Sequence, residues 1–386
     1  MTEYETLKRH LAQNCNAAGQ LLDAAGRIAE LSDDGLSRWK ATCANIAAQL
    51  SEEIMRVAVV GAIKSGKSTF VNTLFGADHL KRGAGVVTSI VTRVRTGERL
   101  KAVLFLKSWD EVNREIQQAA VLLPDDHRSD REQALDIRRA ADRQVLERAL
   151  NALAADQLIS KDTRSAGSVL LAAYLNGYER VQPLVQDNRA TVVFENDHFG
   201  RHRDFVSDDA LAVYLQDVLL EINGPGLGQD VEIADCQGSD SPNPLHLAMI
   251  QDYLMMAHLT IYVISSRTGL RQADIRFLSM IREMGILDMV GFVVNCDFSE
   301  HDDLEDLVQG IGRIEQDVRL ICPEPAMFTF SALFQLMAQS TAELSEKERA
   351  RYTHWCREAE MVDFTSAEHV RFERFLNRKV ERERSS

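Results

Sequence analysis

One stretch of the sequence limits the choice of fold more than any other. It matches the phosphate-binding pattern G-x-x-x-x-G-K-[ST] in full, and its residues are Gly61-Ala62-Ile63-Lys64-Ser65-Gly66-Lys67-Ser68. An apolar run of buried-strand length, residues 56–60, precedes it, and residues 69–75 after it are typical of a helix. A strand, a glycine loop and a helix in this order direct backbone N–H groups and the positive helix end at one point. The pattern therefore predicts a polyphosphate site.

We expect every residue of this loop, together with Thr69, to contact the nucleotide. Lys67 would reach the β- and γ-phosphates, which gives it a catalytic role as well as a binding one. Ser68 would hold Mg²⁺ through its hydroxyl oxygen. The sequence thus predicts a nucleoside triphosphate with a magnesium ion.

Two later segments have the character of nucleotide-sensing switches. Thr88 lies in a glycine-rich loop between the first helix and the next strand, where its hydroxyl would bind Mg²⁺ and its N–H the γ-phosphate. Asp235 and Gly238 form a D-x-x-G pattern at the end of the apolar strand 231–235. The carboxylate would hold Mg²⁺ through water, and the glycine N–H would sense the γ-phosphate. Its place at a strand's carboxyl end is where open α/β sheets bind ligands.

Composition excludes several classes of protein. The chain has 386 residues, enough for about two domains, and a formal charge of −14, which disfavours a nucleic-acid partner. Its six cysteines form no C-x-x-C pair, so we expect reduced thiols in a cytoplasmic protein. We see neither a secretory signal nor an apolar run of ~18 residues, so no membrane span is expected, and attachment to a membrane surface stays open.

Both ends of the chain have helical periodicity. Residues 2–31 and 36–54 carry apolar stripes and are separated by a short polar turn, which predicts an antiparallel hairpin in a first domain, 1–55. Residues 342–386 are again helical, within a last segment 336–386. We expect the terminal helices to pack together as a small bundle beside the nucleotide domain.

The middle of the chain, 56–335, alternates strands and helices, which predicts a mainly parallel sheet covered by helices. A helical insertion at about 108–190 interrupts it. We also expect a helix over 207–222. His198, Arg201, His202 and Arg203 favour a solvated basic turn over a metal site.

With these motifs in hand, the chain resembles the bacterial branch of the dynamin-like GTPases over residues 56–335. The resemblance rests on the segments GAIKSGKST, GAGVVTS, ADCQG, VVNCD and FSAL. It implies GTP hydrolysis with Mg²⁺, homodimerisation through the GTPase domain, and work at a membrane, peripherally at the inner membrane. A protein partner for the helical insertion also stays open.

The base-recognition motif departs from the family pattern [NT]-K-x-D. Here Asn295, Cys296 and Asp297 follow one another, so the lysine is missing and the aspartate arrives one residue early. We expect Asn295 and Asp297 to contact the base, and Ser331 and Ala332 to offer an N–H to the guanine oxygen. GTP is expected over ATP, and an ATP-using relative stays an alternative.

The phosphate loop departs from the family as well. In dynamins, a loop residue at the place of Lys64 helps to hold a monovalent cation beside the phosphates, and we hypothesise that the Lys64 ammonium replaces that ion. The alternative is that Lys64 points to solvent or to a partner. Because Ile63 stands where dynamins carry glutamine, and Ser239 rather than glutamine follows Gly238, hydrolysis is expected to be slow. A nucleotide-binding switch or scaffold with little turnover therefore stays the main alternative.

Overall fold

A computed structural model describes residues 3–27, 34–51, 54–80, 90–120, 134–160, 166–223, 227–236 and 244–385. The chain divides into two compact units. The first comprises residues 1–55 and 377–386, and the second comprises residues 56–376. The domain boundaries expected above and the packing of the terminal helices on one another stay predictions.

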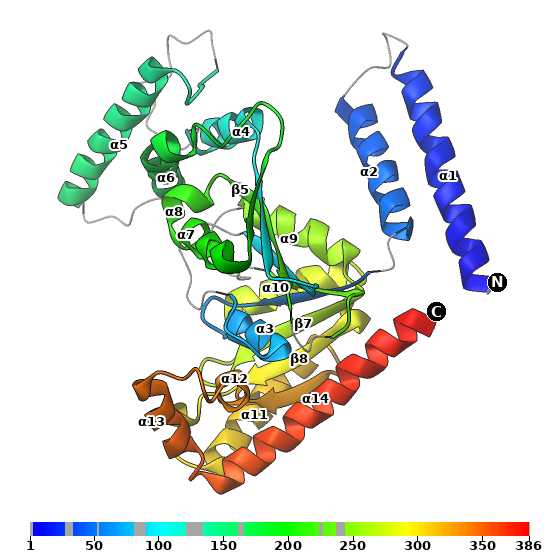
Figure 1. Ribbon diagram of the computed structural model, residues 1–386, viewed down its shortest axis with the longest axis vertical. Helices are drawn as coiled ribbons and strands as arrows, with labels where there is room; N and C mark the ends of the chain where they lie inside the picture. Colours follow the sequence, from blue (N-terminus) through cyan, green and yellow to red (C-terminus); the bar gives the residue numbers. More distant parts are fainter. Residues whose placement is uncertain are drawn as a thin grey trace. The chain divides into compact units, whose positions relative to one another are not determined.

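The first unit contains a pair of helices, α1 (Glu3–Ala25) and α2 (Asp34–Ser51). They lie side by side (Figure 1). An ion pair between Asp23 near the end of α1 and Lys40 near the start of α2 requires an antiparallel arrangement. This is the hairpin that the apolar stripes predict.

The second unit is built on a nine-stranded sheet with the order β4-β3-β5-β2-β6-β1-β7-β8-β9. Its strands are β1 (Met55–Gly61), β2 (Val91–Thr96), β3 (Lys101–Leu106), β4 (Thr191–Glu195), β5 (Leu215–Ile222), β6 (Val231–Asp235), β7 (Leu259–Ser265), β8 (Val290–Asn295) and β9 (Ala326–Phe330). The run β1-β7-β8-β9 is parallel, as is the pair β2-β5, whereas β2-β6, β3-β4 and β3-β5 are antiparallel. The α/β class predicted from the alternating pattern is confirmed.

Helices cover this sheet, and three of them lie beyond one of its ends. They are α3 (Lys67–Phe75), α4 (Trp109–Ala120), α5 (Ala140–Ser160), α6 (Ala166–Val181), α7 (His202–Ser207), α8 (Asp209–Ala212), α9 (Pro244–Met256), α10 (Gln272–Glu283), α11 (Leu304–Arg319), α12 (Ala332–Gln339), α13 (Glu346–Trp355) and α14 (Ala359–Ser385). Short 3-10 turns are η2 (Asn196–Arg201), η3 (Leu287–Met289) and η4 (Phe298–Glu300). Helices α4, α5 and α6 fall between β3 and β4 and gather at the end of the sheet away from α11, α12 and α13 (Figure 1).

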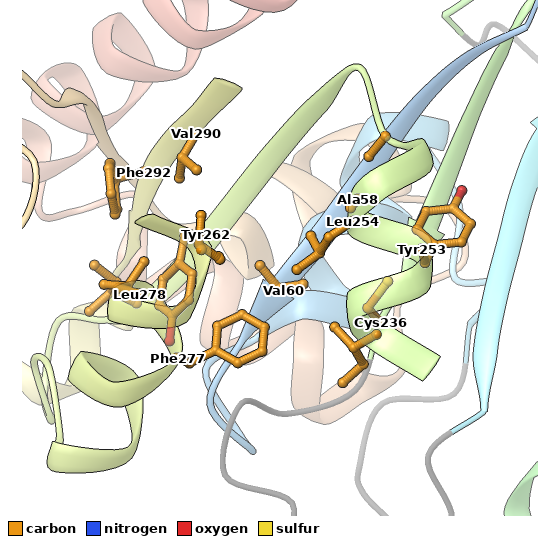
Figure 2. Close-up of a cluster of buried hydrophobic side chains, with 14 of the residues drawn as sticks. Ala58, Val60, Cys236, Tyr253, Leu254, Tyr262, Phe277, Leu278, Val290 and Phe292 are labelled. Atoms are coloured by element: carbon orange, nitrogen blue, oxygen red, sulfur yellow. The ribbon is translucent and has the colours of Figure 1, made fainter. Parts of the chain in front are cut away.

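The main core lies between the sheet and helices α9 and α10 (Figure 2). It joins strand residues such as Val60 and Phe292 to Leu254 of α9 and Phe277 of α10, all at most 3% exposed. Because Met327 of β9 packs on this core, the alternating residues Phe328 and Phe330 face the opposite side of the sheet. There Phe330 contacts the rings of Phe70 in α3 and Phe372 in α14. Both faces of the central strands are therefore covered, and their apolar character follows from that.

The expected helix over 207–222 is wrong in its second half. Asp208 does start a helix, because its side chain accepts the N–H of Ala210, but α8 ends at Ala212 and residues 215–222 form strand β5. Five of the eight residues of β5 are buried, so the strand lacks the alternation that marks a half-exposed strand. A short, continuous apolar run of this kind cannot be told from a buried helix by periodicity.

The segment around His198 also differs from the solvated turn that we expected. Residues 196–207 form η2 and α7, and His202 is buried with its Nδ1 atom 2.5 Å from the carbonyl oxygen of Phe199. Arg203 donates to the carbonyl oxygen of Asp78 in the turn that follows α3. In the part of the chain described, no group of three or more metal-ligating side chains is found, here or elsewhere. The segment packs instead against the turn that follows α3, where Phe199 contacts the ring of His79.

Candidate functional site

The phosphate loop connects β1 to α3 as predicted. Strand residues 57–60 are fully buried, which fixes the strand end from which the loop departs. Gly61 has φ +146°, and a Cβ atom there would lie 2.2 Å from the carbonyl oxygen of Val263 in the neighbouring strand β7. Only glycine fits this conformation and this approach. Lys64, at the tip of the loop, is exposed and has a left-handed φ of +65°.

Lys67, the first residue of α3, folds back over the loop. Its Nζ atom donates to the carbonyl oxygens of Gly61 at 3.1 Å and Ala62 at 2.8 Å, and the side chain is buried. The loop carbonyls thus hold the ammonium at the start of a helix, where the helix dipole also favours an anion. The Lys67 ammonium is therefore already positioned to bind phosphate oxygens at this loop.

Ser68 and Asp235 meet at the same end of the sheet. The Ser68 hydroxyl donates to Oδ2 of Asp235 at 2.6 Å, and Asp235 is the last residue of β6. Burial raises the pKa of the Asp235 carboxyl, and the Lys67 charge and the Ser68 hydrogen bond partly offset that effect. A hydroxyl and a carboxylate converging from two elements form a hard oxygen donor set, which fits Mg²⁺ with its remaining positions filled by water and phosphate.

Asn295 ties the phosphate loop to the loop after β9. It ends β8, and its Nδ2 atom donates to the carbonyl oxygen of Ser65 while its Oδ1 atom accepts the N–H of Ala332, both at 3.0 Å. The predicted base-site residues from two distant segments are therefore brought together. The N–H of Ala332 is used by Asn295, so Ala332 is not the donor to a guanine oxygen in this arrangement. Ser331 begins α12, and its hydroxyl accepts the N–H of Phe334.

Asp297 follows two residues later and is half-buried. Its Oδ1 atom accepts the N–H of Ser299 at 2.9 Å, which caps η4. Its other carboxylate oxygen has no hydrogen-bond partner among the described residues. Cys296, at the place of the family's lysine, is 1% exposed and packs in an apolar cluster with Phe298. The missing lysine has therefore been replaced by an interior residue.

Not every predicted residue can be placed. Thr88 and Gly238 lie outside the described residues. Ile63 and Thr69 are both half-buried, in the loop and in the first turn of α3. Ser65 is 3% exposed, and its hydroxyl has no hydrogen-bond partner in the described part of the chain.

One residue that sequence reasoning missed is Asn72 in α3. It is fully buried, and its side chain donates to Asp78 and to the carbonyl oxygen of Leu80 while accepting the N–H groups of His79 and Leu80. It therefore fixes the turn by which the chain leaves the phosphate-loop helix. An amide at a position of the helix that should be apolar was the available signal.

This fold and this site together define a P-loop nucleotide-binding protein of the α/β class. The sequence pattern of the dynamin family matches residues 57–285, which is more than half of the chain. The chain belongs to the dynamin family, and it carries the GTPase domain of that family.

Two relatives give the extent of the similarity. Dynamin-like protein A of Bacillus subtilis (strain 168) is 21% identical over 315 residues, which is 78% of this chain and 24% of that protein. A solved bacterial dynamin pair, which provides a mechanism for the long-range sensing and tethering of membranes, matches 98% of this chain and 47% of its own with a TM-score of 0.50 and 14% identity. The chain thus spans a quarter to a half of the length of these relatives. None of the described helices has the length and apolarity needed to cross a bilayer.

Proposed function

We propose that the protein is a Mg²⁺-dependent GTPase that binds GTP at the carboxyl edge of its sheet. The observation that carries the proposal is the convergence of Lys67, the Ser68–Asp235 pair and Asn295 on one phosphate loop. Each group has the chemistry required by one part of a magnesium nucleotide: a cation for the phosphates, oxygen ligands for the metal, and an amide that orders the base side.

The residues of the chain divide the work of hydrolysis. The loop N–H groups and Lys67 orient the phosphates and offset the negative charge that spreads over the γ-phosphoryl oxygens in the transition state. Ser68 and Asp235 would hold Mg²⁺, which when bound neutralises charge on the β- and γ-phosphate oxygens. The half-buried carboxylate of Asp297 would accept N–H groups of guanine, which adenine does not offer at the same place.

The resemblance to dynamins supports two finer elements of the proposal. Dimers would form through the nucleotide face when GTP is bound, and the protein would act at a membrane surface. The solved relative that senses and tethers membranes supports this location. Turnover measured with and without lipid vesicles, together with the molecular mass in GTP and in GDP, tests both elements.

A second candidate function is a nucleotide-binding switch with negligible turnover. It is favoured by Ile63, which stands where dynamins carry glutamine, and by the absence of a glutamine after Gly238, because a glutamine orients the attacking water in other GTPases. Calorimetry with GTP and ATP side by side, followed by a turnover assay on the same sample, separates the candidates. Tight GTP binding without phosphate release would select the switch. Equal affinity for ATP and GTP would contradict guanine recognition.

A further inference from the structure

The place of the family's base-recognising aspartate is occupied here by an aromatic ring. Phe298, three residues after Asn295, is 3% exposed. Its ring stacks on Phe334 of α12, with centroids 5.3 Å apart and planes 29° apart, and it lies 5.2 Å from the ring of Trp355 at the end of α13. A side chain at this place is therefore turned into the protein and cannot contact a base. The carboxylate that remains available is Asp297, one residue earlier.

A short chain of hydrogen bonds leads from Asp297 to Trp355. The Ser299 N–H donates to Oδ1 of Asp297 at 2.9 Å, and the Ser299 hydroxyl accepts the Trp355 indole N–H at 3.2 Å. Ser299 is the only residue between the carboxylate and the indole in this chain of contacts. Its position determines where Oδ1 points, because the cap fixes one carboxylate oxygen and thereby orients the other.

Trp355 is itself held firmly. It is 1% exposed and belongs to the cluster that contains Cys296 and Phe298, and the guanidinium of Arg351 lies 5.2 Å from its ring centre. A capping box between Ser345 and Glu348 begins its helix. A large buried ring in a close-packed cluster cannot shift without moving its neighbours.

The far end of the same loop is also fastened. The Nε2 atom of His301 lies 2.7 Å from the hydroxyl of Ser266, the residue that follows β7, and its Nδ1 atom lies 3.1 Å from Asp306. Since Asn295 fixes the near end, the loop 295–301 is held at both ends and, through Trp355, in the middle. The one segment that carries Asp297 is therefore preorganised.

We infer that Trp355 is a positioning residue for base selection: through Ser299 it orients the carboxylate of Asp297 toward the edge of guanine that carries N1 and the 2-amino group. The inference rests on the proposed function, since it assigns a base to that site. Trp355 touches no substrate and acts only through Ser299 and Phe298. It compensates for an aspartate that arrives one residue early, because Phe298 is buried in the aromatic cluster while Asp297 stays half-buried.

Comparison of GTP with ITP tests the inference, because ITP lacks the 2-amino group that donates to the carboxylate. Calorimetry on the full chain would measure both affinities for wild type, Trp355→Phe, Ser299→Ala and the double variant. We expect each single variant to reduce the GTP-to-ITP affinity ratio by about fivefold to tenfold, which is less than the full value of one hydrogen bond to a charged group because the carboxylate is displaced and not removed. The double variant should lose no more than either single one, since both remove the same contact.

Two controls separate positioning from general loosening. Ser299→Thr keeps the hydroxyl and should retain the wild-type ratio. Trp109→Phe changes another buried indole, in α4 of the insertion, and should leave the ratio unchanged. Ser299 is exposed, so Ser299→Ala tests the inference even where Trp355→Phe folds poorly. An unchanged ratio in Ser299→Ala would overturn the inference.

The variant Asp297→Ala distinguishes failure of the inference on Trp355 from failure of the proposed function. Loss of the GTP preference in Asp297→Ala, with a wild-type ratio in Trp355→Phe and Ser299→Ala, would remove the positioning role alone. A wild-type protein that binds neither GTP nor ITP in the presence of Mg²⁺ would overturn the proposed function.

Discussion

Gly66 and Asn295 approach each other so closely that no side chain fits between them. A Cβ atom on Gly66 would lie 2.2 Å from Nδ2 of Asn295, and Gly66 has a φ of +95°. The absence of a side chain at 66 is what allows the Asn295 amide to reach the carbonyl oxygen of Ser65. The phosphate loop and the base loop are thus joined at a point of closest approach.

Gly66→Ala should therefore separate the two loops. The added methyl group requires a strained φ and displaces the Asn295 amide, so we expect GTP affinity to fall by about tenfold or more, with a modest loss of stability. Calorimetric titration with GTP measures the effect. Gly312→Ala, on α11 with nothing within 4 Å of the added Cβ, is the matched control and should bind GTP as wild type does. Wild-type affinity in Gly66→Ala would contradict the geometry.

Ser68→Ala should make nucleotide binding independent of Mg²⁺. The variant removes a metal ligand and leaves the half-buried Asp235 carboxylate without its hydroxyl partner, which costs about 1–3 kcal/mol. GTP affinity measured across a magnesium series should show a wild-type dependence that the variant loses. Ser340→Ala, whose hydroxyl donates to the Leu336 carbonyl of its own helix, serves as the control. If the GTP affinity of Ser68→Ala still increased with Mg²⁺ concentration, Ser68 would be excluded as a metal ligand.

Asp297→Asn should change base preference from GTP toward XTP. Guanine presents N–H groups to a carboxylate, whereas xanthine presents a carbonyl oxygen in place of the 2-amino group, and an asparagine amide can donate to that oxygen. We expect GTP binding to weaken by about one to a few kcal/mol and XTP binding to improve. Competition against a fluorescent nucleotide measures both. Asp303→Asn, at the cap of α11, is the control. No gain for XTP would argue against a base contact by Asp297.

Lys64 carries the prediction on monovalent ions. If its ammonium replaces a cation beside the phosphates, wild-type turnover should be the same in K⁺ and in Na⁺, and Lys64→Ser should be slow and partly rescued by K⁺. Lys64→Arg keeps the charge and should retain most of the rate. Lys64→Gly removes the ammonium and also relieves the left-handed φ of +65°, so it should be slow although it is more relaxed. Strong K⁺ stimulation of wild type would rule out the hypothesis.

The lowered pKa values of His79 and His202 predict that the folded protein loses stability in mild acid. Burial, with the charge of Arg203 nearby, holds the pKa of both side chains below the usual 6.5; Asp78 beside His79 and Asp204 beside His202 oppose the shift without reversing it. Both rings are therefore neutral in the folded protein at pH values above about 6.5. Their contribution to stability is fully present above about pH 6.5, and it declines as pH falls toward the folded-state pKa values, because the unfolded chain takes up protons first.

Chemical denaturation at about pH 7.5 and pH 5.5 checks the sign. The double variant His79→Gln/His202→Gln should lose less stability between the two pH values than wild type does. His354→Gln, on the exposed side of α13, should behave as wild type. An equal drop in all three proteins would assign the acid sensitivity to other groups.

The phosphate side of the site could be predicted from sequence because its signal is local. Strand, loop and helix are contiguous, so Lys67 and Ser68 were identifiable from spacing alone. Asn295 was identifiable from a motif at the end of an apolar strand. The contact between Asn295 and Ser65 joins residues far apart in the chain, and no periodicity encodes it.

The base side of the site was harder to predict from the sequence, for a different reason. Trp355 acts through Ser299, and the two are brought together only by packing of α12 and α13 on the end of the sheet. A large apolar residue, Phe298, at a place where a polar one belongs was the available sign that this loop is anchored inward. Strand β5 was missed because burial on both of its faces removes the alternation on which strand prediction depends.

The position of β5 in the sheet has a consequence for how the protein folds. β5 pairs with β2 on one side and β3 on the other, although the whole helical insertion separates it from both in sequence. The antiparallel pair of β3 and β4 can join the sheet only through β5, so that edge cannot close until the chain has been made well beyond the insertion. Pairings of such long range are slow to form. Both partners of β2, which are β5 and β6, follow the insertion in the chain, so the nascent chain would expose an unpaired β2 until β5 has been made.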